Sequence, residues 1–187
     1  FNINMVVNGD AETGPCAADG NVTRPTGWDY DGDITQLAYN NSYIYNRVNT
    51  IPATAKPGRC LFYGQTSANT SMWQTINLTE YTDSSLIDSE TVKFNLSAWL
   101  GGYVHHNDRA AVSLTFDDQA NHMVGNVTSI GPVDNVDRSN VTSFLFQYTT
   151  GLVPAGARSV TVLVVITRAI GPINDGYADD IGVFLYQ

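Results

Sequence analysis

Short runs of alternating polar and apolar residues constrain the fold of this chain more than any other feature of its sequence. The clearest run covers residues 91–100, in which Val92, Phe94, Leu96, Ala98 and Leu100 alternate with Thr91, Lys93, Asn95, Ser97 and Trp99. Successive side chains of a strand point to opposite faces, so this period of two indicates a strand with one buried face. We expect the first set in a hydrophobic core and the second set on the outer face.

Similar runs recur along the chain, separated by Gly, Pro, Asn and Asp, and no window shows the 3.6-residue period of an amphipathic helix. The other expected strands cover residues 4–8, 34–39, 60–63, 72–78, 110–116, 122–128, 142–148, 159–168 and 177–186. The stretch 160–166 is nearly all apolar, which predicts a central strand buried on both faces. This pattern predicts an all-β chain, a two-sheet antiparallel β-sandwich of the jelly-roll type, with residues 1–187 forming a single domain.

The charge of the chain excludes several classes of partner. There are 9 Lys and Arg residues against 18 Asp and Glu residues, which gives a net charge of −9 at pH 7. This charge repels nucleic-acid phosphates and anionic lipid headgroups, and it tolerates a bound cation. No stretch approaches the roughly 18 apolar residues of a membrane-spanning helix. We therefore expect neither nucleic-acid binding nor membrane insertion.

Seven Asn-x-Ser/Thr triplets, none with Pro in the middle position, predict N-linked glycans. Such glycans are bulky and solubilising, and they belong to proteins that leave the cell. We therefore expect an extracellular protein, secreted or at the cell surface. The expected glycosylation sites are Asn21, Asn40, Asn69, Asn77, Asn95, Asn126 and Asn140.

Two cysteines, Cys16 and Cys60, are compatible with one disulfide in an oxidising compartment. The bond would close a long loop and contribute roughly 3 to 4 kcal/mol. The alternative is a pair of buried free thiols. The spacing matches neither a redox CxxC pair nor a zinc site.

The sequence lacks the motifs of common enzymes, among them a GxSxG elbow, an HExxH helix and a phosphate-binding Walker loop. Glycosidases need two carboxylates facing one another across a cleft, and the sequence alone assigns no such pair. We expect that the chain is not an enzyme.

Three segments resemble the galactose-binding-domain-like β-sandwiches, the superfamily of many carbohydrate-binding modules. They are residues 7–12 (VNGDAE) with Gly27 and Trp28 after them, residues 97–103 (SAWLGGY) and residues 174–181 (NDGYADDI). The resemblance spans the whole chain and implies the same sandwich fold. Modules of this kind occur as enzyme appendages, lectins and cell-wall proteins, so the resemblance specifies the fold better than the function.

The resemblance also implies that the first and last strands lie together, with a structural Ca²⁺ between them. Carried over to this sequence, the ligands would be Glu12 and either Asp179 or Asp180, with Asp10 as a weaker candidate. Calcium takes six to eight oxygen ligands, and turn carbonyls can complete the set. Neighbouring strand residues point to opposite faces, so we expect only one of the two adjacent aspartates to bind. The alternative is a solvated acidic edge.

In such modules sugars bind either on the concave sheet face or at the loops of one end. The richest cluster of aromatic and hydrogen-bonding side chains here is the loop of residues 103–109, which we call the end loop. Aromatic rings supply flat apolar area and polar groups supply orientation, as a sugar site requires. The candidate glycan-binding residues are Trp99, Tyr103, His105, His106, Asn107, Asp108 and Arg109. The alternative is a polar loop whose charged residues pair with one another.

Two non-catalytic functions follow from these observations. The preferred hypothesis is a secreted structural or adhesive glycoprotein that assembles with copies of itself into a filament, sheath or matrix. The alternative is a lectin-like module that recognises extracellular glycans. Seven glycans would cover much of the surface, and the apolar stretch at residues 1–7 could augment a neighbour's sheet, and both points favour the structural hypothesis.

Overall fold

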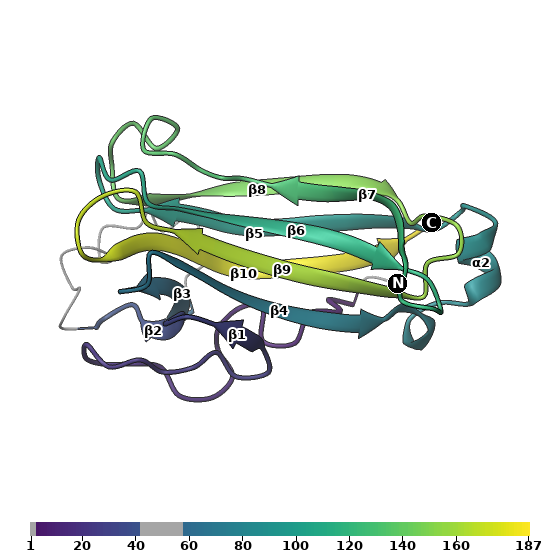
Figure 1. Ribbon diagram of the computed structural model, residues 1–187, viewed down its shortest axis with the longest axis horizontal. Helices are drawn as coiled ribbons and strands as arrows, with labels where there is room; N and C mark the ends of the chain where they lie inside the picture. The colour runs from purple at the N-terminus through teal and green to yellow at the C-terminus, as the bar shows by residue number, and fades with distance from the viewer. Residues whose placement is uncertain (1–2, 42–57) are drawn as a thin grey trace.

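The computed structural model describes residues 3–41 and 58–187, and in this part of the chain ten strands form two antiparallel five-stranded sheets (Figure 1). One sheet has the strand order β1-β4-β9-β6-β7 and the other has the order β2-β3-β10-β5-β8. We call them the β9 sheet and the β10 sheet after their central strands. The predicted all-β sandwich is confirmed.

Nine of the ten strands correspond to predicted ones, and their bounds differ by a few residues. The strands are β1 (Asp29–Asp31), β2 (Thr35–Ala38), β3 (Cys60–Gln65), β4 (Asn69–Asn77), β5 (Lys93–Gly102), β6 (Arg109–Asp117), β7 (Met123–Ile130), β8 (Ser143–Leu152), β9 (Ser159–Thr167) and β10 (Asn174–Tyr186). A short 3-10 helix η1 (Leu78–Glu80) and the helix α2 (Ser84–Asp88) connect β4 to β5. The sequence does not predict strand β1, which pairs with β4.

The alternation in β5 builds the core as expected. Phe94, Leu96, Ala98 and Leu100 are at most 3% exposed between the sheets, and the residues between them point outward. The central position of β9 is also confirmed, but its burial on both faces is not. Val160, Val162, Val164 and Ile166 are fully buried, whereas Leu163 and Val165 are half-buried on the outer face. No second layer of described residues covers that face completely.

The predicted strand at residues 4–8 is wrong, because this segment forms a turn with Asn8 in the left-handed region (φ 51°). It nevertheless completes the β10 sheet. Strand β3 leaves β10 after Ala178, and beyond that point Met5 N donates to Val183 O at 2.9 Å and Ile181 N donates to Gly9 O at 2.8 Å. The first and last segments therefore lie together, as the resemblance implied.

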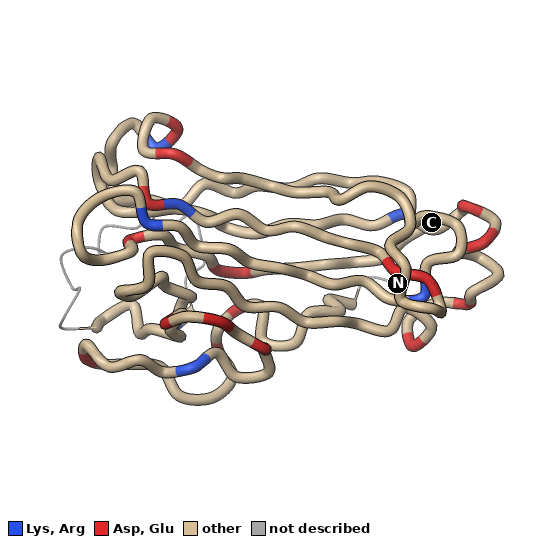
Figure 2. Tube along the Cα trace, in the orientation of Figure 1, with Lys and Arg blue, Asp and Glu red and all other residues tan. Residues whose placement is uncertain are grey.

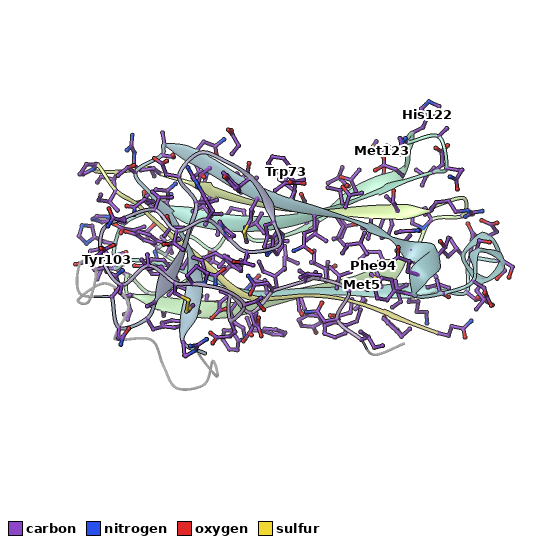
Figure 3. All side chains as sticks on the ribbon, turned by 90° about the horizontal axis from the view of Figure 1, so that it is seen from below. Met5, Trp73, Phe94, Tyr103, His122 and Met123 are labelled. Atoms are coloured by element: carbon purple, nitrogen blue, oxygen red, sulfur yellow. A yellow bond between two sulfur atoms is a disulfide. The ribbon has the colours of Figure 1, made fainter. Side chains whose placement is uncertain are left out.

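The disulfide between Cys16 and Cys60 is present, with a Cα–Cα distance of 6.2 Å (Figure 3). It ties the N-terminal segment to the first residue of β3. The alternative of two free thiols is therefore wrong. No helix of the described part is both long and apolar enough to cross a membrane.

The two ends of the sandwich differ. Both chain termini and α2 lie at one end, whereas the loops that precede β6, β8 and β10 gather at the other. Charged residues lie mostly at these ends and in the loops, while the long strands between them carry few (Figure 2). Tyr103 marks the loop end and lies far from His122 and Met123 at the opposite end.

Candidate functional site

The outer face of the β10 sheet carries a second hydrophobic cluster, separate from the core between the sheets. Its buried members are Ala17, Leu37, Leu61, Tyr63, Phe144 and Tyr177, none more than 4% exposed. The rings touch in sequence, with centroids 5.8 Å apart for Tyr63 and Tyr177 and 5.8 Å apart for Tyr177 and Phe144. This cluster gives the loop end of the face a rigid base.

Three further rings continue this cluster into solvent and form what we call the aromatic strip: Trp99 of β5 with Phe146 and Tyr148 of β8. Trp99 and Phe146 are register partners with ring centroids 5.3 Å apart, and Phe146 stacks on Tyr148 at 5.9 Å. Phe146 is 48% exposed and Tyr148 is 65% exposed. Exposed rings in a row on a sheet present a flat apolar surface. A contiguous apolar surface of this kind on a folded domain is typical of a site that binds a ligand or a partner.

A hollow of about 510 Å³ adjoins the strip on the same face. Ser97 of β5 and Gly182 and Phe184 of β10 line it. Asp10 and Asp180 also line it. The face therefore combines rings for stacking with hydroxyl and carboxylate groups for hydrogen bonding, which is the composition of a site for a polyhydroxylated ligand.

The end loop lies beside this face, but most of its predicted glycan-binding residues make internal contacts. Tyr103 packs against the second hydrophobic cluster together with Trp99. Arg109 pairs with Asp134 at 3.0 Å, and the side chain of Asn107 accepts a hydrogen bond from the backbone of Asn135.

His105, one of the two histidines among the candidate glycan-binding residues, is exposed. Its ring centroid lies 5.2 Å from that of His106. The structure thus places Trp99 in the aromatic strip and Tyr103 against the second hydrophobic cluster, and it assigns Arg109 and Asn107 to loop packing. Sugar contacts of the end loop stay a prediction.

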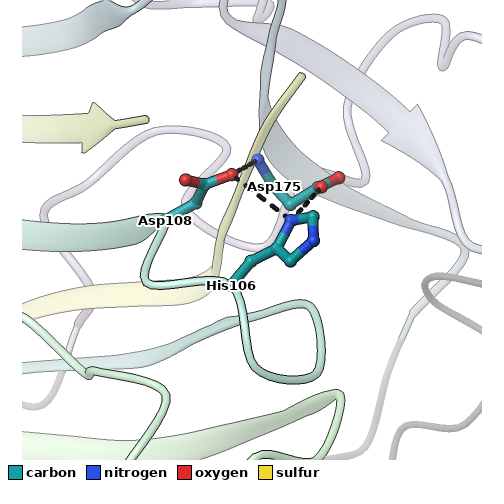
Figure 4. A group of neighbouring side chains, drawn as sticks. All are labelled: His106, Asp108 and Asp175. Atoms are coloured by element: carbon teal, nitrogen blue, oxygen red, sulfur yellow. Dashed lines mark hydrogen bonds and ion pairs between the residues drawn. The ribbon is translucent and has the colours of Figure 1, made fainter. Parts of the chain in front are cut away.

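One group of three possible metal ligands, among the residues that the structure describes, has its ligand atoms within 4.8 Å of one another: His106, Asp108 and Asp175 (Figure 4). His106 Nδ1 lies 3.2 Å from Asp175 Oδ2, whose other oxygen accepts from Tyr63 at 2.8 Å.

Both oxygens of Asp108 accept backbone N–H groups, those of Ala169 and Ile170 on one side and that of Asp175 on the other. These hydrogen bonds to the Asp108 carboxylate fix the loop before β10 against the start of β6. His106, Asp108 and Asp175 therefore form a hydrogen-bonded junction that positions the end loop.

Arg138 fixes the backbone of the end loop through hydrogen bonds of its buried side chain. It is 3% exposed, and its guanidinium donates to the carbonyl oxygens of Gly102, Val104, His106 and Val141. Burial lowers the pKa of Arg138, and the nearby acidic charges, Asp108 among them, oppose that shift. The end loop is therefore fixed by the interior of the molecule, and its exposed residues stand on a defined backbone.

The predicted calcium ligands form an acidic group at the junction of the N-terminal segment and β10: Asp10, Glu12, Asp179 and Asp180. Glu12 accepts hydrogen bonds from the backbone N–H groups of Arg59 and Cys60 and pairs with the Arg59 side chain at 3.2 Å. Asp179 is 4% exposed and accepts from the Tyr39 hydroxyl.

These charges repel one another. Burial, followed by the charges of Asp10 and Glu12, raises the pKa of Asp180. Burial is also the largest cause that raises the pKa of Asp179 well above its ordinary value. A cation would relieve this repulsion, and a calcium site at these residues stays a prediction.

The sequon asparagines lie at the surface. Six are exposed, whereas Asn95, in the middle of β5, is half-buried. Asn69 and Asn77 stand at the two ends of β4, and Asn126 lies on β7, all in the β9 sheet. Occupancy of the sites is a prediction that their accessibility permits.

Sequence reasoning missed Phe146 and Tyr148. The signal was present in the alternation Phe144-x-Phe146-x-Tyr148, which places three rings on one face of a strand. Nothing in the sequence says whether that face is the core or the outside, because the neighbouring strand in space, β5, comes more than forty residues earlier. The pairing with β5 decides it, since Trp99 opposite Phe146 points outward.

No family model and no curated protein matches the sequence. Among solved structures, the enzymatically active domain of tailspike protein 4 from bacteriophage CBA120 is 18% identical with a TM-score of 0.55, and the match covers 98% of this chain but only 22% of the other. A family 16 carbohydrate-binding module is 19% identical with a TM-score of 0.55 and matches over 97% of this chain and 99% of its own.

A third match is the module TmCBM61, solved in complex with β-1,4-galactotriose, which is 15% identical with a TM-score of 0.52 and is covered over 98% of its length. Identities this low establish the fold alone. The chain shares its β-sandwich fold with these carbohydrate-binding modules.

Proposed function

We propose that this chain is a non-catalytic module that binds an extended extracellular glycan across the outer face of the β10 sheet. The observation that carries the proposal is the aromatic strip of Trp99, Phe146 and Tyr148, whose rings stand in a row, with Phe146 and Tyr148 exposed and Trp99 half-buried. A row of rings suits successive sugar units of a chain, since each pyranose has an apolar face that can cover a ring.

The polar groups around the strip supply direction. Ser97 lies opposite Tyr148, and Asp10 and Asp180 border the adjoining hollow. Hydroxyl and carboxylate groups bond to sugar hydroxyls, whereas the rings supply most of the binding free energy. Strand β8 carries no charged residue. An uncharged polysaccharide that docks there therefore removes no charged side chain of this strand from water.

The test measures binding of the protein to a panel of soluble polysaccharides, including β-1,4-galactan and xylan, by affinity electrophoresis and calorimetry. Phe146→Ala and Tyr148→Ala each remove one stacking ring. We expect each to cost about 1 to 2 kcal/mol, a roughly 5- to 30-fold loss of affinity. The matched control is Tyr30→Ala, which removes a ring that is 44% exposed on β1 of the opposite sheet.

Equal losses in the control and strip variants would show that the strip is not the binding site. Retained binding in the double variant Phe146→Ala/Tyr148→Ala would move the site to the end loop, where Tyr103→Ala and His105→Ala are the next variants. Failure of the wild-type chain, produced without N-glycans, to bind any member of a broad panel would overturn the proposal.

The structural-subunit hypothesis receives no support from the fold or from the solved structures that resemble it, which favour the lectin-like alternative. It keeps one clear expectation, namely native particles larger than one chain. Light scattering and negative-stain imaging of the secreted protein measure this directly. Secretion itself is a proposal that the disulfide and the sequons support.

A further inference from the structure

The sequon at Asn95 lies on the binding face. Leu96 is fully buried in the core, so Asn95 and Ser97 on either side of it both point to the outer face of the β10 sheet. The other six sequon asparagines lie on the β9 sheet or in loops outside the strands. Asn95 is the one sequon asparagine that stands on the same strand face as Trp99.

Aromatic residues flank Asn95 on both neighbouring strands. On β10 its register partner is Phe184, and on β8 its partner is Thr150. Tyr148, the partner of Ser97, is then the diagonal neighbour of Asn95, at a separation of about 7 to 8 Å between backbones. A sugar attached to Asn95 Nδ2 would leave the sheet beside Tyr148, which is a member of the aromatic strip.

Gly182 and Phe184 of β10 form the surface on one side of Asn95. A Cβ atom on Gly182 would lie 2.6 Å from the Phe184 ring, so this ring leans over Gly182. Gly182 is in turn the register partner of Ser97, and both residues line the 510 Å³ hollow. A glycan leaving Asn95 therefore emerges between Phe184 on one side and Tyr148 on the other.

We propose that an N-glycan on Asn95 lies along the aromatic strip as an internal ligand, so that the glycosylated chain has its binding face occupied. The inference rests on the proposed function of that face. A tethered ligand acts at an effective concentration in the millimolar range, so a free polysaccharide that binds with a similar intrinsic Kd is outcompeted. The form without this glycan is the one that binds free polysaccharide.

The experiment compares four preparations: the wild-type chain secreted from a glycosylating eukaryotic host, Asn95→Gln and Asn126→Gln from the same host, and the wild-type chain from an oxidising bacterial host that adds no N-glycans. Mass spectrometry of glycopeptides gives the occupancy of Asn95. Asn126→Gln is the matched control, because it removes a strand sequon from the other sheet. Circular dichroism checks that each preparation is folded.

We expect the bacterial protein and Asn95→Gln to bind the polysaccharide found in the panel with similar affinity, and the secreted wild-type chain and Asn126→Gln to bind at least tenfold more weakly. Secreted wild-type protein that is occupied at Asn95 and binds as tightly as Asn95→Gln would overturn the inference. Absence of a glycan at Asn95 in the secreted protein would overturn it as well.

A second readout separates this inference from the proposed function. In a Trp73→Phe background the accessible indole is that of Trp99, because Trp28 is 6% exposed. We expect acrylamide to quench Trp99 less in the secreted protein than in Asn95→Gln. If no preparation binds polysaccharide but this protection is present, the proposed function fails while the glycan's position stands. Equal quenching with Asn95 occupied overturns the position itself.

Discussion

The buried carboxylate of Asp179 is the residue at which fold and charge conflict most. It accepts hydrogen bonds from the Tyr39 hydroxyl and from the backbone of Asp180, but it also lies near the charges of Asp180 and Glu12. Burial is the largest cause of its raised pKa, and the bond from Tyr39 opposes it. Burial and the charge of Asp179 likewise raise the pKa of Tyr39, so that hydroxyl keeps its proton.

These shifts set the direction of a pH dependence. The pKa of Asp179 is higher in the folded than in the unfolded state, so the folded state binds the proton more tightly. With chelator present, the contribution of Asp179 to stability should therefore increase as the pH falls from neutral through the folded pKa toward its ordinary value of 3.8. Asp180, whose pKa is also raised, acts in the same direction.

Asp179→Asn tests this directly. The amide keeps an acceptor for Tyr39 and removes the charge, so we expect the melting temperature at neutral pH, in chelator, to rise by a few degrees; about 1 kcal/mol corresponds to roughly 2 to 4 °C in a chain of this size. The difference should shrink as the pH approaches 4. A lower melting temperature at neutral pH would show that the charge, or the hydrogen bond that the second carboxylate oxygen accepts from the backbone N–H of Asp180, stabilises the fold.

With calcium present, the wild-type chain should melt at a higher temperature than Asp179→Asn, the reverse of the order expected in chelator. If the acidic group binds Ca²⁺, millimolar calcium will raise the melting temperature of the wild-type chain. At a calcium concentration of a hundred times Kd, binding adds about 2.7 kcal/mol to the free energy of unfolding. Glu12→Gln and Asp179→Asn should lose this response, whereas Glu80→Gln, which changes an exposed residue, should keep it. An equal response in all four proteins would place the ion at other residues. No response in any of them would show that the chain does not bind calcium under these conditions.

At the scale of elements, the strands with strong alternation can be predicted from the sequence, and those held by unusual partners cannot. Strand β5 is recognisable because every second residue is apolar. Strand β1 has the sequence Asp-Tyr-Asp, which has low strand propensity, and it forms because β4 supplies a partner edge. The segment at residues 4–8 is the opposite case, since its apolar residues suggest a strand while Asn8 and Gly9 impose a turn.

The same limit applies to the site. Residue types along the chain are enough to select the acidic group and the end loop as candidates, but the aromatic strip joins β5 to β8 and depends on register. Periodicity gives the spacing of side chains within one strand, and it contains no information about which distant strand lies beside it. Trp99 is a candidate from the sequence, whereas its partner Phe146 becomes visible only through the pairing of the two strands.

The junction of the N-terminal segment with β10 predicts a sensitive glycine. A Cβ atom on Gly9 would lie 2.0 Å from the carbonyl oxygen of Ile181, which breaks the pairing of the two segments. We expect Gly9→Ala to lower the free energy of unfolding by about 1 to 3 kcal/mol in urea titrations.

The control for that variant is Gly171→Ala. Gly171 has a φ of 72°, but a Cβ atom added to it would meet no other atom within 4 Å, so its substitution adds backbone strain without a clash. A cost for Gly9→Ala no greater than the cost for Gly171→Ala would show that the N-terminal segment adapts and is not essential to the sheet.

For the whole molecule, the disulfide is the one covalent link between the N-terminal segment and the β10 sheet in the described part of the chain. Its two cysteines are separated by 44 residues, and closing a loop of that length contributes roughly 3 to 4 kcal/mol. We expect the double variant Cys16→Ser/Cys60→Ser to melt roughly 10 °C lower than the wild-type chain in calorimetry. A loss of less than about 2 °C would mean that packing alone holds the segment in place.

The sandwich separates what holds it together from what touches a ligand. Between the sheets, β5 and β10 supply core residues, whereas the rings of β8 point away from that core. Two of the three rings of the aromatic strip stand on β8, which lies at the edge of its sheet and pairs with β5 alone. Mutations at Phe146 and Tyr148 therefore change the surface and leave the inter-sheet packing intact. Descendants of such a chain can diverge in sugar preference through a few substitutions along one edge, and a randomised library at these positions would reproduce that divergence in the laboratory.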